Sequence, residues 1–459
     1  MKARFLKSVR TGALAALTAA LSMAATSAPA SGQNVIRDSE IEETLRIYTD
    51  PLLRAAGVVP EDVSLYLIDD DSLNAGVTGG QNILINTGLI MAADNPNEIM
   101  GVLAHEVGHI AGGHLARSRE AMNQSMRPAF ISLGLGVLAI AAGAPDAGAA
   151  LISGAGTFAQ GNFVRHTQVQ ESAADQAAAG YLESTGQSGR GLVSFFGNLR
   201  RYEFQVRNLP PYVLSHPFSS DRMEALRQRV QTSPHYAADD TADNLRRFEF
   251  MQAKLVGFTR SRGQTLARYP LTDTSQPARY ARAVAYYRAS ELPEARAELN
   301  SLLEESPDNP FYHELMGQIL FENGRAEEAL PYHRRALELE PNDALLLTNL
   351  ARSLTSARRR AGAEEAVALL TRATQIEPDN AFAWRELAQA RELMGQRGLA
   401  ELASAEQNYA MRNYPAAVSF AERARRTLEQ NTPSYQRASD IAIFAGEEVR
   451  EIEERERRS

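Results

Sequence analysis

A threefold repeat in the second half of the chain limits its fold more than any other feature of the sequence. The segments SPDNPF, EPNDAL and EPDNAF place Pro307, Pro341 and Pro378 at intervals of 34 and 37 residues. Alanine, leucine, arginine and glutamate recur between them at helical spacing. Units of this length hold two antiparallel helices, which bury their apolar faces only by stacking on their neighbours. Residues 279–459 are therefore predicted to form an α-solenoid.

Small residues recur inside these units at the points where stacked helices approach closely. They are Gly317, Ala329, Ala336, Ala351, Ala366 and Ala373. Once ARRRAG is allowed a three-residue insertion, these positions resemble those of the tetratricopeptide repeat. An ordinary helical bundle is the alternative. Because such stacks usually present a concave groove to another protein, we expect this region to recruit protein partners.

The N-terminal segment is typical of a secretory signal peptide. Four basic residues precede a short alanine- and leucine-rich run, and a small-x-small cleavage site ends at Ala30. A transmembrane anchor is the alternative, but the apolar run is shorter than the roughly 20 residues that a span needs. We therefore expect residues 1–30 to be removed near Ala30 and the mature protein to be periplasmic.

Composition narrows the chemistry that is available to the chain. It has no cysteine, so disulfides and thiolate ligands are excluded, and any metal must bind to His, Asp or Glu. The full chain carries 48 basic and 56 acidic residues; removal of the four basic signal residues leaves 44 against 56, a net charge of −12. An acidic chain without a basic tract is not expected to bind nucleic acid.

The first half, residues 31–230, mixes helical patterns with one β region. We predict strands near Leu65–Ile68 and Ile83–Asn86, separated by a turn-rich segment that contains Gly79 and Gly80. Residues 231–278 are predicted to supply a polar break and one connecting helix before the repeats.

Three of the chain's 8 histidines fall within HEVGHIAGGH. The preceding residues predict a helix, because Asn95 can cap it, Pro96 suits its first position and Glu98 completes a capping box.

On that helix, His105 and His109 lie four residues apart and leave the same face, so both imidazoles can bind one ion. Glu106 lies beside them, where its carboxylate can reach a water on that ion. This is the HExxH arrangement of two zinc ligands and a general base. A chance pattern on a solvated helix is the alternative.

A third ligand must come from elsewhere in the chain. His114 is one candidate, but a continuous helix would turn it about 140° away from His109, and a polar residue at the helix end is the preferred interpretation. In QVQESAADQAAAG, Glu171 and Asp175 share one face of an alanine-rich helix. We expect Glu171 to complete the site and Asp175 to hold a ligand histidine by its other ring nitrogen.

AHEVGHIAGGH and ESAADQAA together resemble the M48 family of zinc metalloproteases, and NAGVTGGQNILINTGLI resembles the strand region upstream of that family's zinc helix. The resemblance implies a gluzincin-type α+β domain with a small β-sheet, followed by an α-solenoid, in a chain that is mainly α. It also implies one zinc ion on His105, His109 and Glu171, with Glu106 as the catalytic base and Asp175 behind the ligands.

VLSHPFSSDRMEAL matches a further segment of that family, SHPxxxxR. The resemblance places His216 near the zinc as a fourth, regulatory ligand and Arg222 in the wall of the site, with Gly79 and Gly80 in the substrate strand. A plain loop followed by a capped helix is the alternative for His216.

Residues 127–163 are almost uncharged and rich in glycine. We expect a hydrophobic helical hairpin beside the active site that touches lipid or unfolded substrate; a buried core hairpin is the alternative.

The residues themselves predict hydrolysis of peptide bonds at zinc. The resemblance implies the substrates, misassembled or stalled outer-membrane proteins, and implies that the repeats recruit the outer-membrane assembly machinery. A chaperone or adaptor of outer-membrane protein assembly with a mostly latent zinc site is the alternative from another class, and a zinc aminopeptidase is a third.

Overall fold

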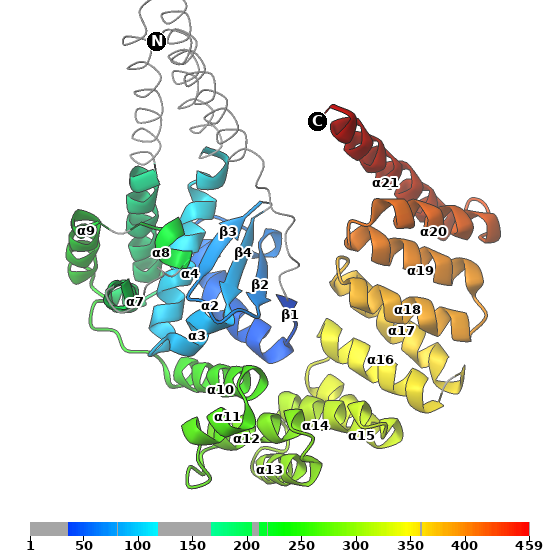
Figure 1. Ribbon diagram of the computed structural model, residues 1–459, viewed down its shortest axis with the longest axis horizontal. Coiled ribbons are helices and arrows are strands. Elements are labelled where there is room, and N and C mark those ends of the chain that lie inside the picture. The colour runs from blue at the N-terminus through cyan, green and yellow to red at the C-terminus, as the bar shows by residue number, and fades with distance from the viewer. Residues whose placement is uncertain are drawn as a thin grey trace, which may run out of the picture.

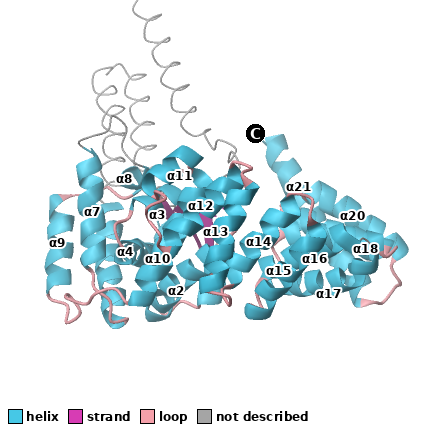
Figure 2. Ribbon diagram, turned by 90° about the horizontal axis from the view of Figure 1, so that it is seen from below, coloured by secondary structure: helices cyan, strands magenta, loops and turns pink. Residues whose placement is uncertain are grey.

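The computed structural model describes residues 35–79, 81–117, 167–203, 211–217, 219–358 and 360–458. The expected signal peptide, Gly80 and the apolar segment 127–163 lie outside the described residues. The described chain is mainly α-helical with one small sheet near its start, and an array of paired helices extends away from that sheet (Figures 1 and 2). The predicted fold class is thereby confirmed.

The sheet has four strands in the order β1-β2-β4-β3. They are β1 (Val35–Ile36), β2 (Ser64–Ile68), β3 (Ala75–Thr78) and β4 (Asn82–Asn86). β2 and β4 pair in parallel, while β1 and β3 pair antiparallel with them at the two edges. The two predicted strands correspond to β2 and β4. β3 lies in the segment that was expected to be rich in turns. It was not predicted because a strand of four residues that contains a glycine gives almost no signal in the sequence.

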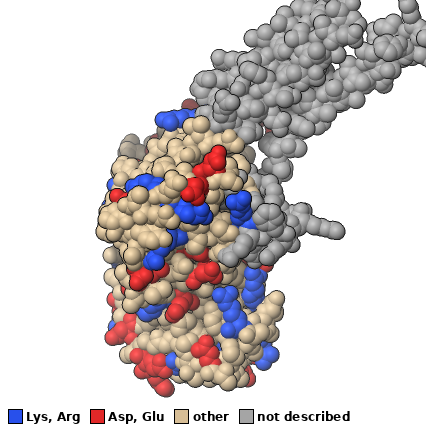
Figure 3. Space-filling model, turned by 90° about the vertical axis from the view of Figure 1, so that its left-hand side faces the viewer, with Lys and Arg blue, Asp and Glu red and all other residues tan. Residues whose placement is uncertain are grey.

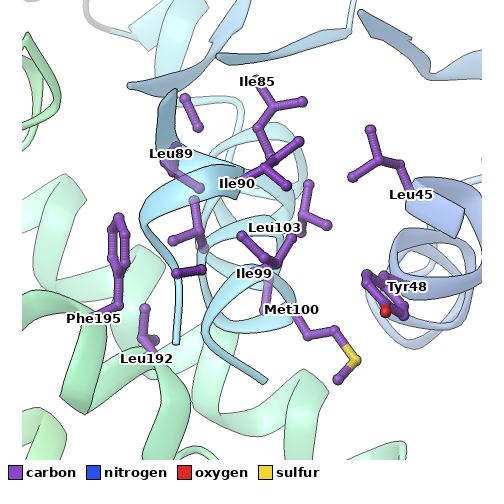
Figure 4. Close-up of a cluster of buried hydrophobic side chains, with 14 of the residues drawn as sticks. Leu45, Tyr48, Ile85, Leu89, Ile90, Ile99, Met100, Leu103, Leu192 and Phe195 are labelled. Atoms are coloured by element: carbon purple, nitrogen blue, oxygen red, sulfur yellow. The ribbon is translucent and has the colours of Figure 1, made fainter. Parts of the chain in front are cut away.

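Helices α2 (Ser39–Ala55), α3 (Thr87–Ala92) and α4 (Pro96–Ala111) pack against the sheet. Every residue of α4 from Pro96 to Gly108 is buried. Figure 4 shows why: Ile99, Met100 and Leu103 lie among side chains of α2, β4 and a later helix. Since α4 carries the histidine motif, that motif lies on a helix that is enclosed over most of its length.

Side-chain caps fix the start of α4. The Asn95 carboxamide oxygen accepts a hydrogen bond from the backbone N–H of Glu98 at 3.0 Å, as predicted. The Glu98 carboxylate, however, accepts hydrogen bonds from the backbone N–H of Asp94 at 3.0 Å and from the Ser194 hydroxyl at 2.7 Å. The expected capping box is therefore shifted by one residue, and it ties α4 to a neighbouring helix.

That neighbour is α7 (Arg190–Glu203), which is followed by α8 (Pro211–Ser215) and α9 (Ser220–Gln231). α7 crosses α4 so closely that a Cβ atom added at Gly101 would lie 2.7 Å from the backbone nitrogen of Leu192. Only glycine permits this crossing. On the face that carries α7 and α9, acidic and basic side chains are interspersed (Figure 3), as on an ordinary solvated surface.

The region between the two halves holds two helices, α10 (Ala242–Thr259) and α11 (Arg262–Arg268), where one was expected. α10 is not a solvated connector. Its Phe248, Met251 and Leu255 belong to the same core as α2 and α4, whereas Phe250 belongs to the first core of the solenoid. One helix therefore completes two hydrophobic cores.

The remaining helices of the described chain form consecutive antiparallel pairs. The pairs are α12 (Gln276–Arg288) with α13 (Leu292–Glu305), α14 (Pro310–Glu322) with α15 (Ala326–Leu339), α16 (Ala344–Arg358) with α17 (Arg360–Ile376), α18 (Ala381–Leu393) with α19 (Arg397–Ala410), and α20 (Tyr414–Thr427) with α21 (Pro433–Arg458). The three repeat prolines lie in the turns between pairs. The extra residues of the third unit lengthen its helices to 15 and 17 residues, against 13 and 14 in the pair before. None of the described helices is long and apolar enough to cross a membrane.

A buried ion cluster joins the two halves. The Lys254 ammonium on α10 lies 2.8 Å from Asp38 and 3.1 Å from Glu40, at the start of α2. The hydroxyl of Tyr280, on the first solenoid helix, donates to Glu40 at 2.9 Å. Burial alone would lower the pKa of Lys254, but Asp38, Tyr280 and Glu40 raise it well above its ordinary value. Lys254 therefore stays charged although it is fully enclosed.

Replacement of Lys254 by Ala is expected to destabilise the protein by about 3–5 kcal/mol, because Asp38 and Glu40 lose their buried counter-charge. Urea unfolding followed by circular dichroism measures the loss. The control is Arg455→Ala, which removes an exposed pair with Glu451 and should leave the curve unchanged. Equal curves for the two variants would show that the cluster does not hold the halves together.

Candidate metal centre

Three segments that are far apart in the sequence bring potential metal ligands to one place. α4 supplies His105 and His109, the helix over residues 167–184 supplies Glu171, and His216 follows α8 directly. One donor atom from each of the four lies within 4.8 Å of all the others. Glu171, and not His114, thus joins the two motif histidines in the donor cluster.

The donor spacing fits a tetrahedral ion. The Nε2 atoms of His105 and His109 are 3.0 Å apart, and each lies 3.4 Å from a Glu171 oxygen. The Nδ1 atom of His216 lies 3.3 Å from His105 Nε2 and 3.0 Å from Glu171. A tetrahedral zinc site with bonds of about 2.0–2.1 Å separates its donors by about 3.3 Å. The cluster is therefore compatible with a single zinc ion held by nitrogen and oxygen.

Asp175 and Arg222 lie behind the ligands. Asp175 contacts His105 Nδ1 at 2.9 Å, on the side of the ring that faces away from the cluster. The Arg222 guanidinium binds both oxygens of Asp175, and its Nη1 lies 3.0 Å from Glu171. Arg222 is buried and supports the two carboxylates from behind; it was expected to line the site, but it does not border the cavity that opens at the cluster.

Both carboxyls are held in the ionised form that metal binding requires. Burial alone would raise the pKa of Glu171, but hydrogen bonds with His105 and His216 lower it below its ordinary value. For Asp175, hydrogen bonds with Arg222 and His105 likewise overcome burial and lower the pKa. Two ionised carboxylates therefore share one enclosed region with a single permanent cation.

Glu106 is placed differently from the other acids. Its carboxylate is fully buried, and within the described chain neither oxygen has a hydrogen-bond partner. The closest charged contact is His216 Nε2 at 3.6 Å. A buried carboxylate without partners is energetically costly. A ligand bound at the cluster, such as a water molecule, would remove that cost, and both oxygens of Glu106 are available to it.

A cavity of about 530 Å³ opens at the cluster. It is bordered by Glu106, His109, Glu171, His216 and by residues 74–77, which include most of β3. β3 is an edge strand, so an extended peptide can pair with its free side and lie across the cluster. Gly79 follows β3 on the surface, while Gly80 lies outside the described residues.

His114 takes a position that a continuous helix would forbid. α4 ends at Ala111, and Gly113 has a left-handed φ of +60°, which interrupts the helix before a new helical turn begins at His114. The His114 ring fills the space that a side chain at Gly112 would need, and its Nδ1 lies 3.0 Å from His109 Nδ1. His114 is thus buried behind His109 rather than solvated at a helix end. The two glycines before His114 were the sequence signal that the helix would end there.

Tyr212 was not foreseen. Its ring is fully buried and packs on His216 with centroids 4.5 Å apart, and its hydroxyl has no hydrogen-bond partner in the described chain. Burial and the charges of Glu106 and Glu171 raise the pKa of Tyr212 well above its ordinary value, so the phenol stays neutral. No sequence pattern marked this residue.

Gly108 sets the distance between the two helices that supply ligands. A Cβ atom at Gly108 would lie 2.9 Å from the carbonyl oxygen of Ala174, on the helix that carries Glu171. Gly108→Ala is therefore expected to weaken zinc binding about 10–100-fold without removing a ligand, the usual effect of disturbing the groups around a metal site. Competition with a chelating dye measures the affinity. Gly101→Ala, which clashes with α7 instead, is the control and should keep its zinc affinity; a similar loss in both would count against this role of Gly108.

Comparison with known proteins agrees with this geometry. Residues 39–230 match the family model described as Peptidase family M48, and residues 264–310 and 280–344 match the tetratricopeptide repeat. The beta-barrel assembly-enhancing protease of Yersinia pestis is 27% identical over 337 residues, which cover 72% of this chain and 68% of that protein. The protein of the same name from Escherichia coli (strain K12) is 27% identical over 65% of this chain and 62% of its own length. Metalloprotease YcaL of Escherichia coli (strain K12) is 29% identical over 37% of this chain and 63% of its own length.

The chain thus spans about two thirds of the length of these relatives. The family match covers strands β2 to β4, α4, the Glu171 helix and nearly all of α9, and the repeat matches cover α12 to α15. The chain therefore carries a metalloprotease domain of peptidase family M48, followed by tetratricopeptide repeats.

Proposed function

We propose that this protein is a periplasmic zinc endopeptidase that degrades misassembled outer-membrane proteins and aids their assembly, while its repeats recruit partner proteins. The carrying observation is the largely buried cluster of His105, His109 and Glu171 beside Glu106, whose carboxylate has no hydrogen bond to any described residue. The names of the relatives support the link to β-barrel assembly. The basic and apolar N-terminal segment supports export.

The residues divide the chemistry between them. His105, His109 and Glu171 would hold the zinc, which when bound supplies a Lewis acid and a water of lowered pKa. Glu106 accepts the proton of the attacking water and delivers it to the leaving amine. Asp175 and Arg222 keep His105 and Glu171 in position. The edge strand β3 aligns the peptide, and this suits an endopeptidase, since an internal stretch of chain can pair with it along its length.

His216 is the natural regulator of this site. Its Nδ1 lies 3.3 Å from His105 Nε2 and 3.0 Å from Glu171, so it would take the fourth zinc position, which a catalytic site leaves to water or substrate. In that position His216 would restrain hydrolysis until its ring moves away. This same observation favours the second candidate function, a chaperone or adaptor of outer-membrane protein assembly whose zinc site is mostly latent.

Replacement of Glu106 by Gln tests the hydrolytic role. The variant should still bind zinc in a one-to-one ratio, because Glu106 is not a ligand in this assignment, but casein cleavage should fall at least about 100-fold with loss of the general base. Zinc content and the rate of casein cleavage, measured on the same samples, show whether cleavage is lost while zinc is retained. If assembly of outer-membrane proteins is supported equally well by Glu106→Gln, the chaperone function replaces the protease function.

His216→Ala and His105→Ala should act in opposite directions. Removal of His216 opens the fourth corner and should raise casein cleavage several-fold, whereas removal of His105 should abolish both zinc binding and cleavage. Initial rates at matched zinc occupancy give the comparison. A loss of activity in His216→Ala as deep as that in His105→Ala would contradict the regulatory role.

A further inference from the structure

The turn after α4 brings another histidine onto the back of His109, one of the candidate zinc ligands. The Nδ1 atoms of His109 and His114 lie 3.0 Å apart, and the two ring centres are 4.9 Å apart with their planes at 81°. The Nε2 atom of His109 points the other way, into the donor cluster, where it lies 3.0 Å from His105 Nε2. The contact with His114 therefore uses the one ring nitrogen of His109 that a metal ion would leave free.

Two glycines make room for this contact. A Cβ atom at Gly112 would collide with the His114 ring, which is buried. Gly113 has a left-handed φ of +60°, a conformation that glycine adopts at little cost. The Gly-Gly-His sequence thus does more than end α4, because it places a buried imidazole behind a candidate ligand.

The backbone of His114 makes a second connection to the metal centre. Its carbonyl oxygen accepts a hydrogen bond from the carboxamide of Gln170 at 3.2 Å. Gln170 is buried and directly precedes Glu171 on the helix over residues 167–184. His114 therefore contacts two helices that supply donors to the cluster: α4 through its ring and the Glu171 helix through its backbone.

The chemistry of imidazole sets the direction of the hydrogen bond between the two rings. A neutral histidine that binds a metal through Nε2 carries its proton on Nδ1. His109 must then donate, so Nδ1 of His114 must accept, and the proton of a neutral His114 lies on its Nε2. A single acceptor thereby fixes both the tautomer and the ring orientation of His109.

The two motif histidines are held by different kinds of acceptor. Nδ1 of His105 lies 2.9 Å from Asp175, whose carboxylate is held in the ionised form, whereas His109 has an imidazole in the equivalent place. Glu106, Glu171 and Asp175 already bring three carboxylates into this buried region. A fourth carboxylate behind His109 would be costly to bury, so a neutral acceptor is the less costly support.

We propose that His114 is a positioning residue of the metal centre. Its Nδ1 accepts the hydrogen bond from His109 and holds that ligand in the tautomer and orientation that zinc binding requires, while its carbonyl oxygen anchors the helix that carries Glu171. His114 is not a zinc ligand in this assignment. The inference rests on the proposed function in one respect, since it explains how the zinc site assigned there keeps its second histidine in place.

Two replacements of His114 separate the hydrogen bond from packing. His114→Leu keeps apolar bulk but removes the acceptor, and it should weaken zinc binding about 10–100-fold, the usual effect of losing such a partner. His114→Gln keeps an oxygen that can accept the same hydrogen bond, and it should bind zinc at least about fivefold more tightly than His114→Leu. Competition with a chelating dye on the full-length mature chain measures both affinities.

His333→Leu is the matched control. His333 is also a buried histidine, and its Nδ1 lies 2.8 Å from the Ser353 hydroxyl. Its ring likewise packs over a glycine, Gly317, where a Cβ atom would collide with it. This variant should lose stability to urea but keep the zinc affinity of the unsubstituted chain, because it disturbs the same kind of packing in the solenoid without any effect on His109.

The tautomers themselves can be measured on the unsubstituted chain. Nitrogen–proton correlation spectra of the zinc-loaded protein with 15N-labelled histidine should show His109 protonated on Nδ1 and His114 protonated on Nε2. A scalar coupling across the N–H···N hydrogen bond should join the two Nδ1 atoms, and this identifies the pair without any variant.

A zinc affinity of His114→Leu equal to that of the unsubstituted chain, an equal loss in His114→Leu and His114→Gln, or a His114 ring protonated on Nδ1 would each overturn the proposal. So would a comparable loss of zinc affinity in His333→Leu. An unsubstituted chain that binds zinc and cleaves casein but gives one of these results fails here alone. One that binds no zinc removes the proposed function together with this inference.

Discussion

The candidate metal centre depends on a guanidinium that never reaches the substrate cavity. Arg222 binds Asp175 through two hydrogen bonds and touches Glu171 from the same side. Without that cation, two buried carboxylates would face each other at a cost of several kcal/mol per charge, and one would take up a proton. With it, Asp175 stays ionised behind His105. Glu171, whose pKa is lowered by hydrogen bonds with His105 and His216, gains a third cationic neighbour at 3.0 Å. Electrostatic attraction therefore organises the site: α9 supplies the positive charge of Arg222, the helix over residues 167–184 supplies the two carboxylates, and α4 supplies the two imidazoles.

The enclosure of α4 makes this arrangement rigid. The helix is capped at Asn95, tied to α7 through Glu98 and Ser194, and surrounded by apolar side chains as far as Gly108. Catalytic groups gain most when their supporting residues leave them little freedom. His216 is the one potential ligand that is held by a short helix and a loop. It is also the group whose displacement would open the fourth zinc position.

Much of the architecture could be predicted because it has a local signature. The proline spacing predicted the helix pairs, and the cap at Asn95 predicted α4. The four-residue spacing of His105 and His109 predicted that both side chains lie on one face of that helix. What escaped prediction depends on long-range contact. Tyr212 matters because α8 brings its ring onto His216, and no periodicity encodes that meeting. His114 was set aside by assuming a continuous helix, whereas the helix is interrupted at Gly113. β3 is stabilised by pairing with β4, not by its own sequence. The role of Lys254 likewise arises only where the two halves of the chain meet.

The double duty of α10 has a consequence for how such a protein can be built and inherited. A repeat array attached through a flexible tether could be exchanged for another by simple recombination, with each module keeping its own stability. Here the helix that would serve as the tether fills the interior of both modules, so neither half has a complete apolar interior alone. Substitutions that loosen the first repeats will therefore also destabilise the core around the histidine helix, because α10 belongs to both.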